Sequence, residues 1–171
     1  MIRRLTRGLA LIDRLSELSG RATSWLVMPL VLGVTYEVFA RYALNAPTVW
    51  AYDLAYMLYA SIFMLGAAYA LRYGAHVRTD FLYNGFSDRR KAMVDTVGYV
   101  LFLPALLFYL LAIGRQALHS WEIGERSTES TWRAPLYPFK WMMVIALVLL
   151  LLQAAVELLR ALEALRGNHE E

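Results

Sequence analysis

Four apolar stretches, each long enough to cross a bilayer, constrain this chain more than any other feature of its sequence. They occupy residues 22–44, 50–71, 92–113 and 136–159. A helix needs roughly 20 mostly apolar residues to cross about 30 Å of hydrocarbon. Hydrophobic residues make up 59% of the chain and charged residues only 18%, which is too apolar for a soluble domain of this length. The sequence therefore predicts an all-α integral membrane protein, with four transmembrane helices in a single domain, 1–171.

The segment 1–20, ahead of the first apolar stretch, has a second helical pattern. Apolar residues recur there at helical spacing, with arginines between them: Ile2, Leu5, Leu9, Ile12 and Leu15. This pattern is typical of an amphipathic helix that lies in the headgroup plane. We expect that helix to end near Gly20 and the first transmembrane helix to follow. A polar lead of this length also argues against a cleavable signal peptide, so we expect the first span to remain in the protein.

The distribution of lysine and arginine predicts the orientation in the membrane. Basic residues gather in segment 1–21 and in the loop 72–91, and Arg160 and Arg166 follow in the tail 160–171. The turn 45–49 has none, and the loop 114–135 has three arginines offset by three glutamates. Because cytoplasmic loops carry an excess of Lys and Arg, we expect both termini and loop 72–91 in the cytoplasm. We therefore expect a multi-pass protein of an inner membrane.

Three charged residues lie in or beside the first two spans. Glu37 and Arg41 are four residues apart, the spacing at which a Glu and an Arg on one helix can pair. Asp53, at the start of the second span, is expected to approach Arg41 and complete a Glu37, Arg41, Asp53 network. Charged side chains inside a membrane are energetically costly, so a charged network there is expected to have a structural or functional role. It could clamp the first hairpin, contact a partner subunit, or relay a proton or ion.

The loop after the second span carries Arg72, His76, Arg78 and Asp80. These residues could serve only as topology and turn signals, or they could dock against a larger membrane partner. The loop 124–135, rich in hydroxyl and charged groups, is similarly either a mobile connection or a docking surface.

Several kinds of function are excluded or disfavoured by what the sequence lacks. The chain has no cysteine, hence no disulfide and no thiolate metal site. Its three histidines are predicted on opposite sides of the membrane or in the tail, which does not suit a haem. There is no phosphate loop and no converging set of catalytic groups. We therefore expect neither an enzyme nor a bound cofactor, and no nucleic-acid partner.

Together, several short motifs resemble a known family. They are Tyr36-Glu-Val-Phe-Ala-Arg-Tyr42, Asn45-Ala-Pro-Thr-Val-Trp50, Asp53-Leu54, Gly66-Ala-Ala-Tyr-Ala-Leu-Arg72 and His76-Val-Arg-Thr-Asp80. Their order and spacing resemble the small, or Q, subunit (DctQ-type) of tripartite ATP-independent periplasmic (TRAP) transporters, over about 45 residues. The chain looks most like the mannitol or chloroaromatic-compound branch. It departs from many members at Tyr52 and Asp53, where they have an acidic pair, and at Tyr56, where they have Arg.

The resemblance implies a role within a larger transporter. A soluble periplasmic substrate-binding protein (P type) would capture a small organic acid or related solute, and a large elevator-type membrane subunit (M type) would move it with a sodium gradient. The small subunit would act as a scaffold, embedded in membrane lipids, that braces the large subunit and helps to dock the binding protein. The residues expected to form its structural ion network or partner interface are Glu37, Arg41, Trp50, Asp53, Arg72, His76, Arg78 and Asp80.

One alternative function belongs to another class. In a small four-helix multidrug antiporter, a membrane carboxylate on the first helix, here Glu37, would alternate between a proton and a cationic drug. Arg41, one helical turn away, argues against this because it would neutralise that carboxylate.

Overall fold

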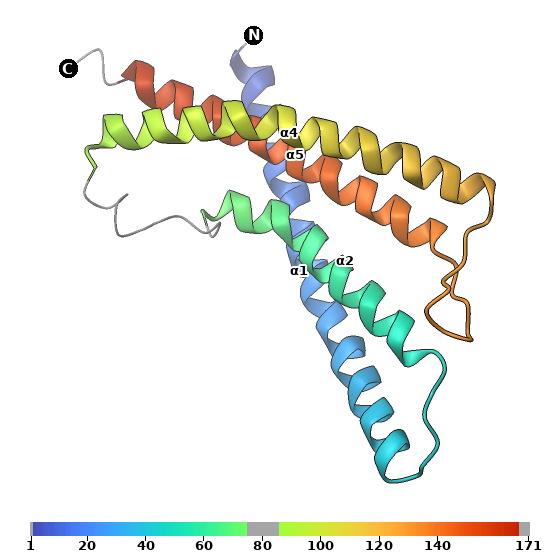
Figure 1. Ribbon diagram of the computed structural model, residues 1–171. Coiled ribbons are helices and arrows are strands. Elements are labelled where there is room, and N and C mark those ends of the chain that lie inside the picture. Colours follow the sequence, from blue (N-terminus) through green and yellow to red (C-terminus); the bar gives the residue numbers. More distant parts are fainter. Residues whose placement is uncertain (1, 75–85, 168–171) are drawn as a thin grey trace.

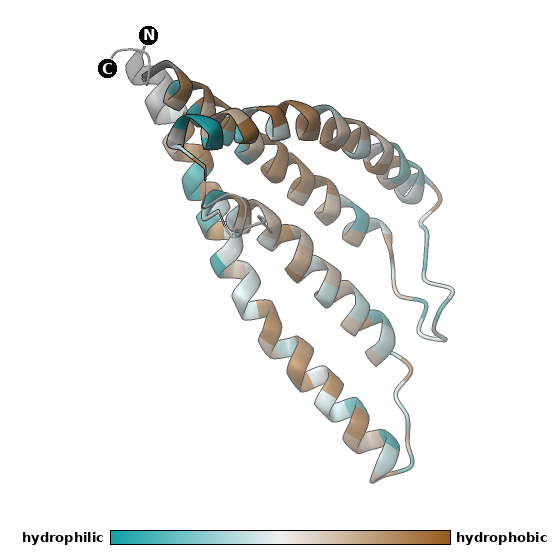
Figure 2. Ribbon diagram, turned by 60° about the vertical axis from the view of Figure 1, so that its left-hand side comes forward, coloured by the Kyte–Doolittle hydropathy of each residue, from teal (hydrophilic) through white to brown (hydrophobic). Residues whose placement is uncertain are grey.

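The computed structural model describes residues 2–74 and 86–167, without the side chains of residues 2–7, 88 and 166–167. The helices of this described part are α1 (Ile2–Tyr42), α2 (Ala51–Arg72), α4 (Asp88–Glu122) and α5 (Tyr137–Gly167). Each of the four is long and apolar enough to cross a membrane. Figure 2 shows the hydrophobic residues along these helices. The prediction of an all-helical protein with four membrane-spanning helices is confirmed.

The four helices fan out from one end of the molecule, as Figures 1 and 2 show. This end, called the terminal end below, holds the first turns of α1 and α4 and the last turns of α2 and α5. The opposite hairpin end holds the connections 43–50 and 123–136. Helix α1 packs on α2, α2 packs on α5, and α5 packs on α4, while α1 also reaches α5. Helix α5 therefore links the two halves of the fan.

A small apolar core forms where α5 meets α2 and α4. Its fully buried residues are Ala68, Leu71, Leu106, Leu147, Leu150 and Ala154. Many other large apolar side chains are exposed, among them Phe63 and Phe108, whose exposed fractions are 70% and 76%. Exposed apolar surface on this scale requires lipid or another protein to cover it. The open fan is thus a membrane structure whose helices pack through only part of their surface.

Helix α1 differs from the prediction. The amphipathic helix expected to end near Gly20 and the first spanning helix are one uninterrupted helix, Ile2–Tyr42. The predicted helix end near Gly20 is therefore wrong. Gly20 is needed for close packing, because a Cβ there would lie 2.3 Å from Cγ of Tyr69 on α2. Glycine here allows two helices to approach closely, a common use of small residues in membranes.

The first half of α1 turns its polar stripe inward. Ser16 and Thr23 are buried against the other helices, whereas Leu11 and Leu18 are exposed. In a water-soluble amphipathic helix the apolar side chains are buried and the polar ones are exposed, so the arrangement here is the reverse. It suits a helix in lipid, where polar and small residues favour helix contacts and apolar residues favour the acyl chains. Whether this segment lies in the headgroup plane stays a prediction.

Helix α4 is also longer than expected. It continues past residue 113 to Glu122, so the predicted loop 114–135 narrows to the connection 123–136. Ile123 caps the helix and is followed by Gly124, whose φ of +59° is the left-handed conformation in which many helices end. Helix α5 continues past residue 159 to Gly167, the last residue that the structure describes.

Replacing Gly20 with alanine should destabilise the packing of α1 on α2. The added methyl group overlaps the Tyr69 ring, and we expect a loss of about 1 to 2 kcal/mol in the free energy of unfolding. Gly8 lies on the same helix, and a Cβ added there would meet no atom within 4 Å, so Gly8→Ala is the matched control and should not destabilise. Unfolding in mixed detergent micelles measures both. Equal stability of the two variants would contradict this packing.

Candidate functional site

The terminal end holds a cluster of polar side chains between three helices. This terminal polar cluster consists of Asp13, Ser16 and Glu17 from α1, Arg72 from α2, and Gln153, Glu157 and Arg160 from α5. Apart from the pairs Gln153–Glu157 and Glu157–Arg160, its bonds cross between helices. The cluster therefore fixes the crossing of α1, α2 and α5.

Asp13 is at the centre of this cluster. One carboxylate oxygen pairs with the Arg160 guanidinium, and the other accepts a hydrogen bond from Nε2 of Gln153 at 3.1 Å. Nε of Arg72 lies 3.8 Å from Oδ1 of Asp13. The Asp13 carboxylate thus contacts groups from both other helices. A carboxylate in this half-buried position is stabilised by the two guanidinium groups.

Gln153 and Ser16 are the most deeply buried polar residues of the cluster. Their side chains are both 0% exposed, and Oγ of Ser16 donates to Oε1 of Gln153 at 2.8 Å. The Gln153 amide also donates to Oε1 of Glu157 at 2.9 Å. Hydrogen bonds of this kind hold membrane helices together, because lipid offers a polar group no other partner.

Arg72 ends α2 inside the cluster. It donates to the backbone oxygen of Asp13 at 2.6 Å and to Oε2 of Glu17 at 2.9 Å. Its guanidinium also lies 5.3 Å from the centre of the Tyr73 ring. The sequence predicts Arg72 as a topology signal or a partner contact. The structure gives it an internal role, joining α2 to α1.

At the hairpin end, Glu37 makes the predicted contact with Arg41 and a second contact that the sequence did not indicate. Its Oε1 pairs with Arg41 at 2.5 Å. Its Oε2 accepts a hydrogen bond from the backbone nitrogen of Thr48 at 2.9 Å and another from the Thr48 hydroxyl. Glu37 therefore anchors the connection 43–50 to α1. Both of its oxygens are occupied by groups of this chain.

Asp53 does not join Glu37 and Arg41, so the predicted three-membered network is wrong. Its carboxylate, 2% exposed, instead accepts hydrogen bonds from Ser127 at 2.8 Å and from Ser130 at 2.6 Å. Asp53 lies at the start of α2, on the side of the connection 123–136. The free oxygen of the Glu37–Arg41 pair is instead hydrogen-bonded to Thr48. The Asp53 contact thus ties the two halves of the fan together at the hairpin end.

The remaining predicted residues fall into two groups. Trp50 stacks on Tyr36 with ring centroids 6.0 Å apart, which holds the connection 43–50 against α1. His76, Arg78 and Asp80 lie outside the described residues. A role for any of the predicted residues at a partner interface stays a prediction.

Glu125 and Lys140 form an ion pair across the connection 123–136. Nζ of Lys140 donates to Oε2 of Glu125 at 2.5 Å. This hydrogen bond, with the positive charge behind it, lowers the pKa of Glu125 below its ordinary value near 4.5. The pair fixes the start of α5 to the loop before it.

The Glu125 pair predicts a pH dependence of stability. A carboxyl group whose pKa is lowered by folding stabilises the protein above its ordinary pKa, and that contribution is lost as the pH falls through the folded value. The melting temperature should therefore drop as the pH is lowered from neutral to about 4 or below, and Glu125→Gln should make the drop shallower. Glu122→Gln, an exposed change in the adjacent turn, is the control and should keep the wild-type slope. The same slope in all three proteins would refute this contribution.

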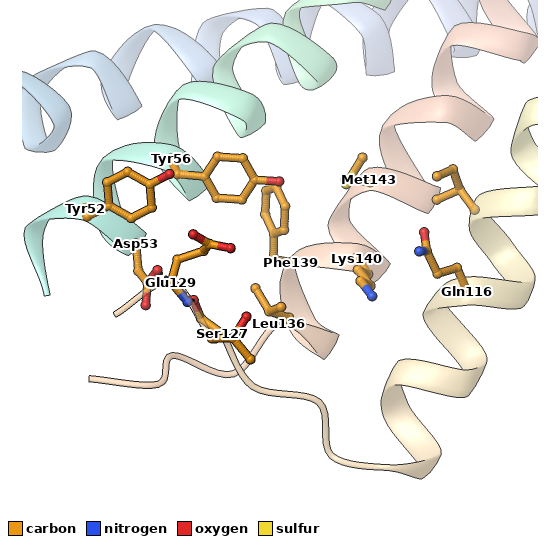
Figure 3. Close-up of a pocket in the computed structure, with 12 residues that line it drawn as sticks. Tyr52, Asp53, Tyr56, Gln116, Ser127, Glu129, Leu136, Phe139, Lys140 and Met143 are labelled. Atoms are coloured by element: carbon orange, nitrogen blue, oxygen red, sulfur yellow. Dashed lines mark hydrogen bonds between the residues drawn. The ribbon is translucent and has the colours of Figure 1, made fainter. Parts of the chain in front are cut away.

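A cavity of about 520 Å³, called the hairpin-end cavity, opens beside the Asp53 contact. Figure 3 shows Tyr52, Asp53 and Tyr56 of α2 on one side of it, together with Glu129. Gln116 of α4 and Lys140 of α5 lie on the other side. Among the described residues, no group of three His, Asp or Glu side chains could hold a metal ion. The lining of the cavity combines separated opposite charges with aromatic rings.

Comparison with known families decides the identity of this fold. The family model for tripartite ATP-independent periplasmic transporters, DctQ component, matches residues 30–164. The chain belongs to the DctQ family. It is thus a small TRAP transporter subunit and a multi-pass membrane protein, not a member of an enzyme family. A comparison with curated proteins gave no match.

The residues matched by the DctQ family model include only part of the terminal polar cluster. Arg72, Gln153, Glu157 and Arg160 lie within the matched residues, whereas the α1 residues that bind them precede residue 30. DctQ subunits normally act with a large M subunit and a periplasmic binding protein.

Proposed function

We propose that this DctQ chain is the stationary scaffold of its TRAP transporter, bracing the large subunit while that subunit moves substrate. An elevator-type transporter needs a fixed reference in the membrane against which its mobile part travels. The observation that carries the proposal is the pair of polar connections between the halves of the fan. The terminal polar cluster joins α1, α2 and α5 at one end, and the Asp53 contact joins α2 to the connection 123–136 at the other.

Burial of the key groups supports a structural use of these charges. Gln153, Ser16 and Asp53 are almost fully buried, and their polar atoms bond to other groups of this chain. Glu37 has both oxygens occupied by Arg41 and Thr48. A carboxylate that carries protons or drugs across a membrane has to be released to its cargo. The alternative of a multidrug antiporter therefore gains no support from this geometry.

The exposed apolar faces support assembly with a larger membrane protein. Large apolar side chains are exposed on two of the helices, among them Trp25, Leu32 and Phe39 on α1 and Leu101 and Phe108 on α4. Lipid can cover such residues, and so can the helices of a partner subunit. We further propose that the polar connection 123–136 helps to dock the periplasmic binding protein, since it projects from the hairpin end.

The orientation proposed for the scaffold places both termini in the cytoplasm of a bacterial inner membrane. The basic segments 1–21 and 72–91 support it, because Lys and Arg favour the cytoplasmic side. The chain has no cysteine, so a single cysteine introduced by Thr131→Cys reports on the hairpin end alone. A membrane-impermeant maleimide should label it in intact spheroplasts. Labelling only after lysis would reverse the orientation.

Affinity purification from native membranes in mild detergent tests the scaffold proposal. We expect a much larger membrane subunit to co-purify in roughly stoichiometric amount, and the complete system to transport solute when the binding protein is added. The small organic acid substrate and the sodium coupling implied by the family are tested in the same proteoliposomes. Transport by this chain alone would overturn the proposal.

A further inference from the structure

Two neighbouring cavities follow one another between α2 and α4, and together they are called the valley. The first is the hairpin-end cavity, lined by Tyr56, Ile113 and Met143 among others. The second, called the apolar groove, has a volume of about 760 Å³ and is lined only by apolar, aromatic and small side chains, including Phe63, Gly66, Tyr109 and Leu147. In both cavities, α2 and α4 form the two sides and α5 lies at the bottom.

The two cavities follow one another along the helix axes. On α2 the lining passes from Tyr56 to Ile62, about 9 Å at 1.5 Å per residue. On α5 it passes from Met143 to Leu147, about 6 Å. The valley is therefore polar beside the ends of the spanning helices and apolar toward their middle. That order matches the change from headgroups to acyl chains in a bilayer leaflet.

The polar part of the valley separates opposite charges. In Figure 3 the carboxylate of Glu129 projects toward the Tyr52 and Tyr56 rings, beside Asp53. In the described part of the chain, neither Asp53 nor Glu129 forms an ion pair; Asp53 is bonded only to serine hydroxyls. Lys140 lies across the cavity, and of its three donors one is directed to Glu125. The net charge of this lining favours a cationic group near the tyrosines and leaves donors for an anion near Lys140.

We propose that the valley binds one zwitterionic phospholipid with an ammonium headgroup, such as phosphatidylethanolamine. The ammonium group lies against Glu129 and the tyrosine rings, which attract it by charge and by cation–π contact, and the negative charge of the buried Asp53 behind them adds to the attraction. The phosphate is within reach of Lys140, and an acyl chain occupies the apolar groove. Anionic lipids bind less well, because the Lys140 charge is shared with Glu125 and two carboxylates repel them. The bound lipid fills the space between α2 and α4 and completes the scaffold.

A helix of the larger subunit is the competing occupant. Gly66 and Ala70 in the groove would allow a helix to approach closely. An apolar helix seated in the groove leaves the charged hairpin-end cavity unfilled, whereas an amphiphile occupies both cavities. The two occupants give different products in a cross-linking experiment.

Photo-cross-linking identifies the occupant directly. Benzoylphenylalanine is placed at Phe63, which lines the groove, and separately at Phe108, an exposed residue that lines neither cavity. The full chain, with whatever subunits accompany it, is irradiated in native membranes and analysed by mass spectrometry. Ethanolamine lipid should be enriched over phosphatidylglycerol at position 63 relative to position 108. A peptide of another subunit at position 63, or the same lipid ratio at both positions, would overturn the proposal.

Two substitutions test the contact with the headgroup and the contact with the acyl chain separately. Glu129→Gln should reduce the ethanolamine lipid retained after purification by about tenfold through loss of a charged contact, with Glu122→Gln as the control. Ala67→Phe fills the groove and should reduce retention of every phospholipid, whereas Val97→Phe on α4 should not. Wild-type retention in both test variants, with correct folding verified by circular dichroism, would refute the site. Lipid is measured on this chain, so the outcome is independent of whether a larger subunit co-purifies.

Discussion

Replacing Asp13 with alanine is expected to separate α1 from α2 and α5 at the terminal end. The substitution leaves Arg160, Arg72 and the Gln153 amide without their shared carboxylate. Removing one partner of a buried ion pair costs about 3 to 5 kcal/mol; here, because the groups are partly exposed, we expect about 2 to 4 kcal/mol. The free energy of unfolding in mixed micelles measures the loss.

The control for Asp13 is an acid of the same kind outside the cluster. Glu163 is exposed on α5, and Glu163→Ala should change the stability by less than about 0.5 kcal/mol. A double-mutant cycle of Asp13→Ala with Arg160→Ala should show coupling, because the two side chains pair directly. Additive losses would mean that the pair does not stabilise the fold.

Replacing Asp53 with alanine is expected to release the connection 123–136 from α2. Two charge-assisted hydrogen bonds, to Ser127 and Ser130, are lost from a buried position. We expect a loss of about 2 to 3 kcal/mol in stability. The connection should also become much more sensitive to protease added from the side of the hairpin end.

Arg41→Ala distinguishes the observed contact from the network expected from the sequence. Arg41 pairs with Glu37, and Asp53 is bonded elsewhere. Arg41→Ala should therefore leave the protease sensitivity of 123–136 at the wild-type level. If Arg41→Ala made the connection 123–136 as sensitive to protease as Asp53→Ala does, that result would support the three-membered network and contradict the Asp53 contact.

Local rules predict the parts of the structure that depend on neighbouring residues. Hydropathy alone locates the four spanning helices, because a bilayer sets the length of a span. The Glu37 and Arg41 pair follows from their spacing of four on one helix. The partner of Asp53 does not follow from such rules. Proximity along the chain suggests Arg41, whereas the tertiary fold supplies serines more than 70 residues away.

The terminal polar cluster could not be predicted in the same way. The bond from Ser16 to Gln153 joins residues 137 positions apart, and only the packing of α1 on α5 brings them together. One signal was available in the sequence. Ser16, Gly20 and Thr23 recur at helical spacing beside the apolar stripe of segment 1–20, and in a membrane such small and polar residues mark the face that packs on other helices. The prediction of an interfacial helix assumes instead that water covers this polar face.

The distance between the two halves of the fan, measured during transport, tests the scaffold most directly. Because the chain has no cysteine, the labels at Tyr42→Cys on α1 and Leu118→Cys on α4 are the only spin labels in this subunit, and a cysteine-free background is used for the other subunits. Pulsed electron–electron double resonance is recorded on the complete transporter in liposomes, with and without a sodium gradient, substrate and binding protein. The scaffold predicts one narrow distance distribution that is the same in every state. Two populations that exchange as transport proceeds would show that this subunit moves, and would contradict its role as the fixed reference.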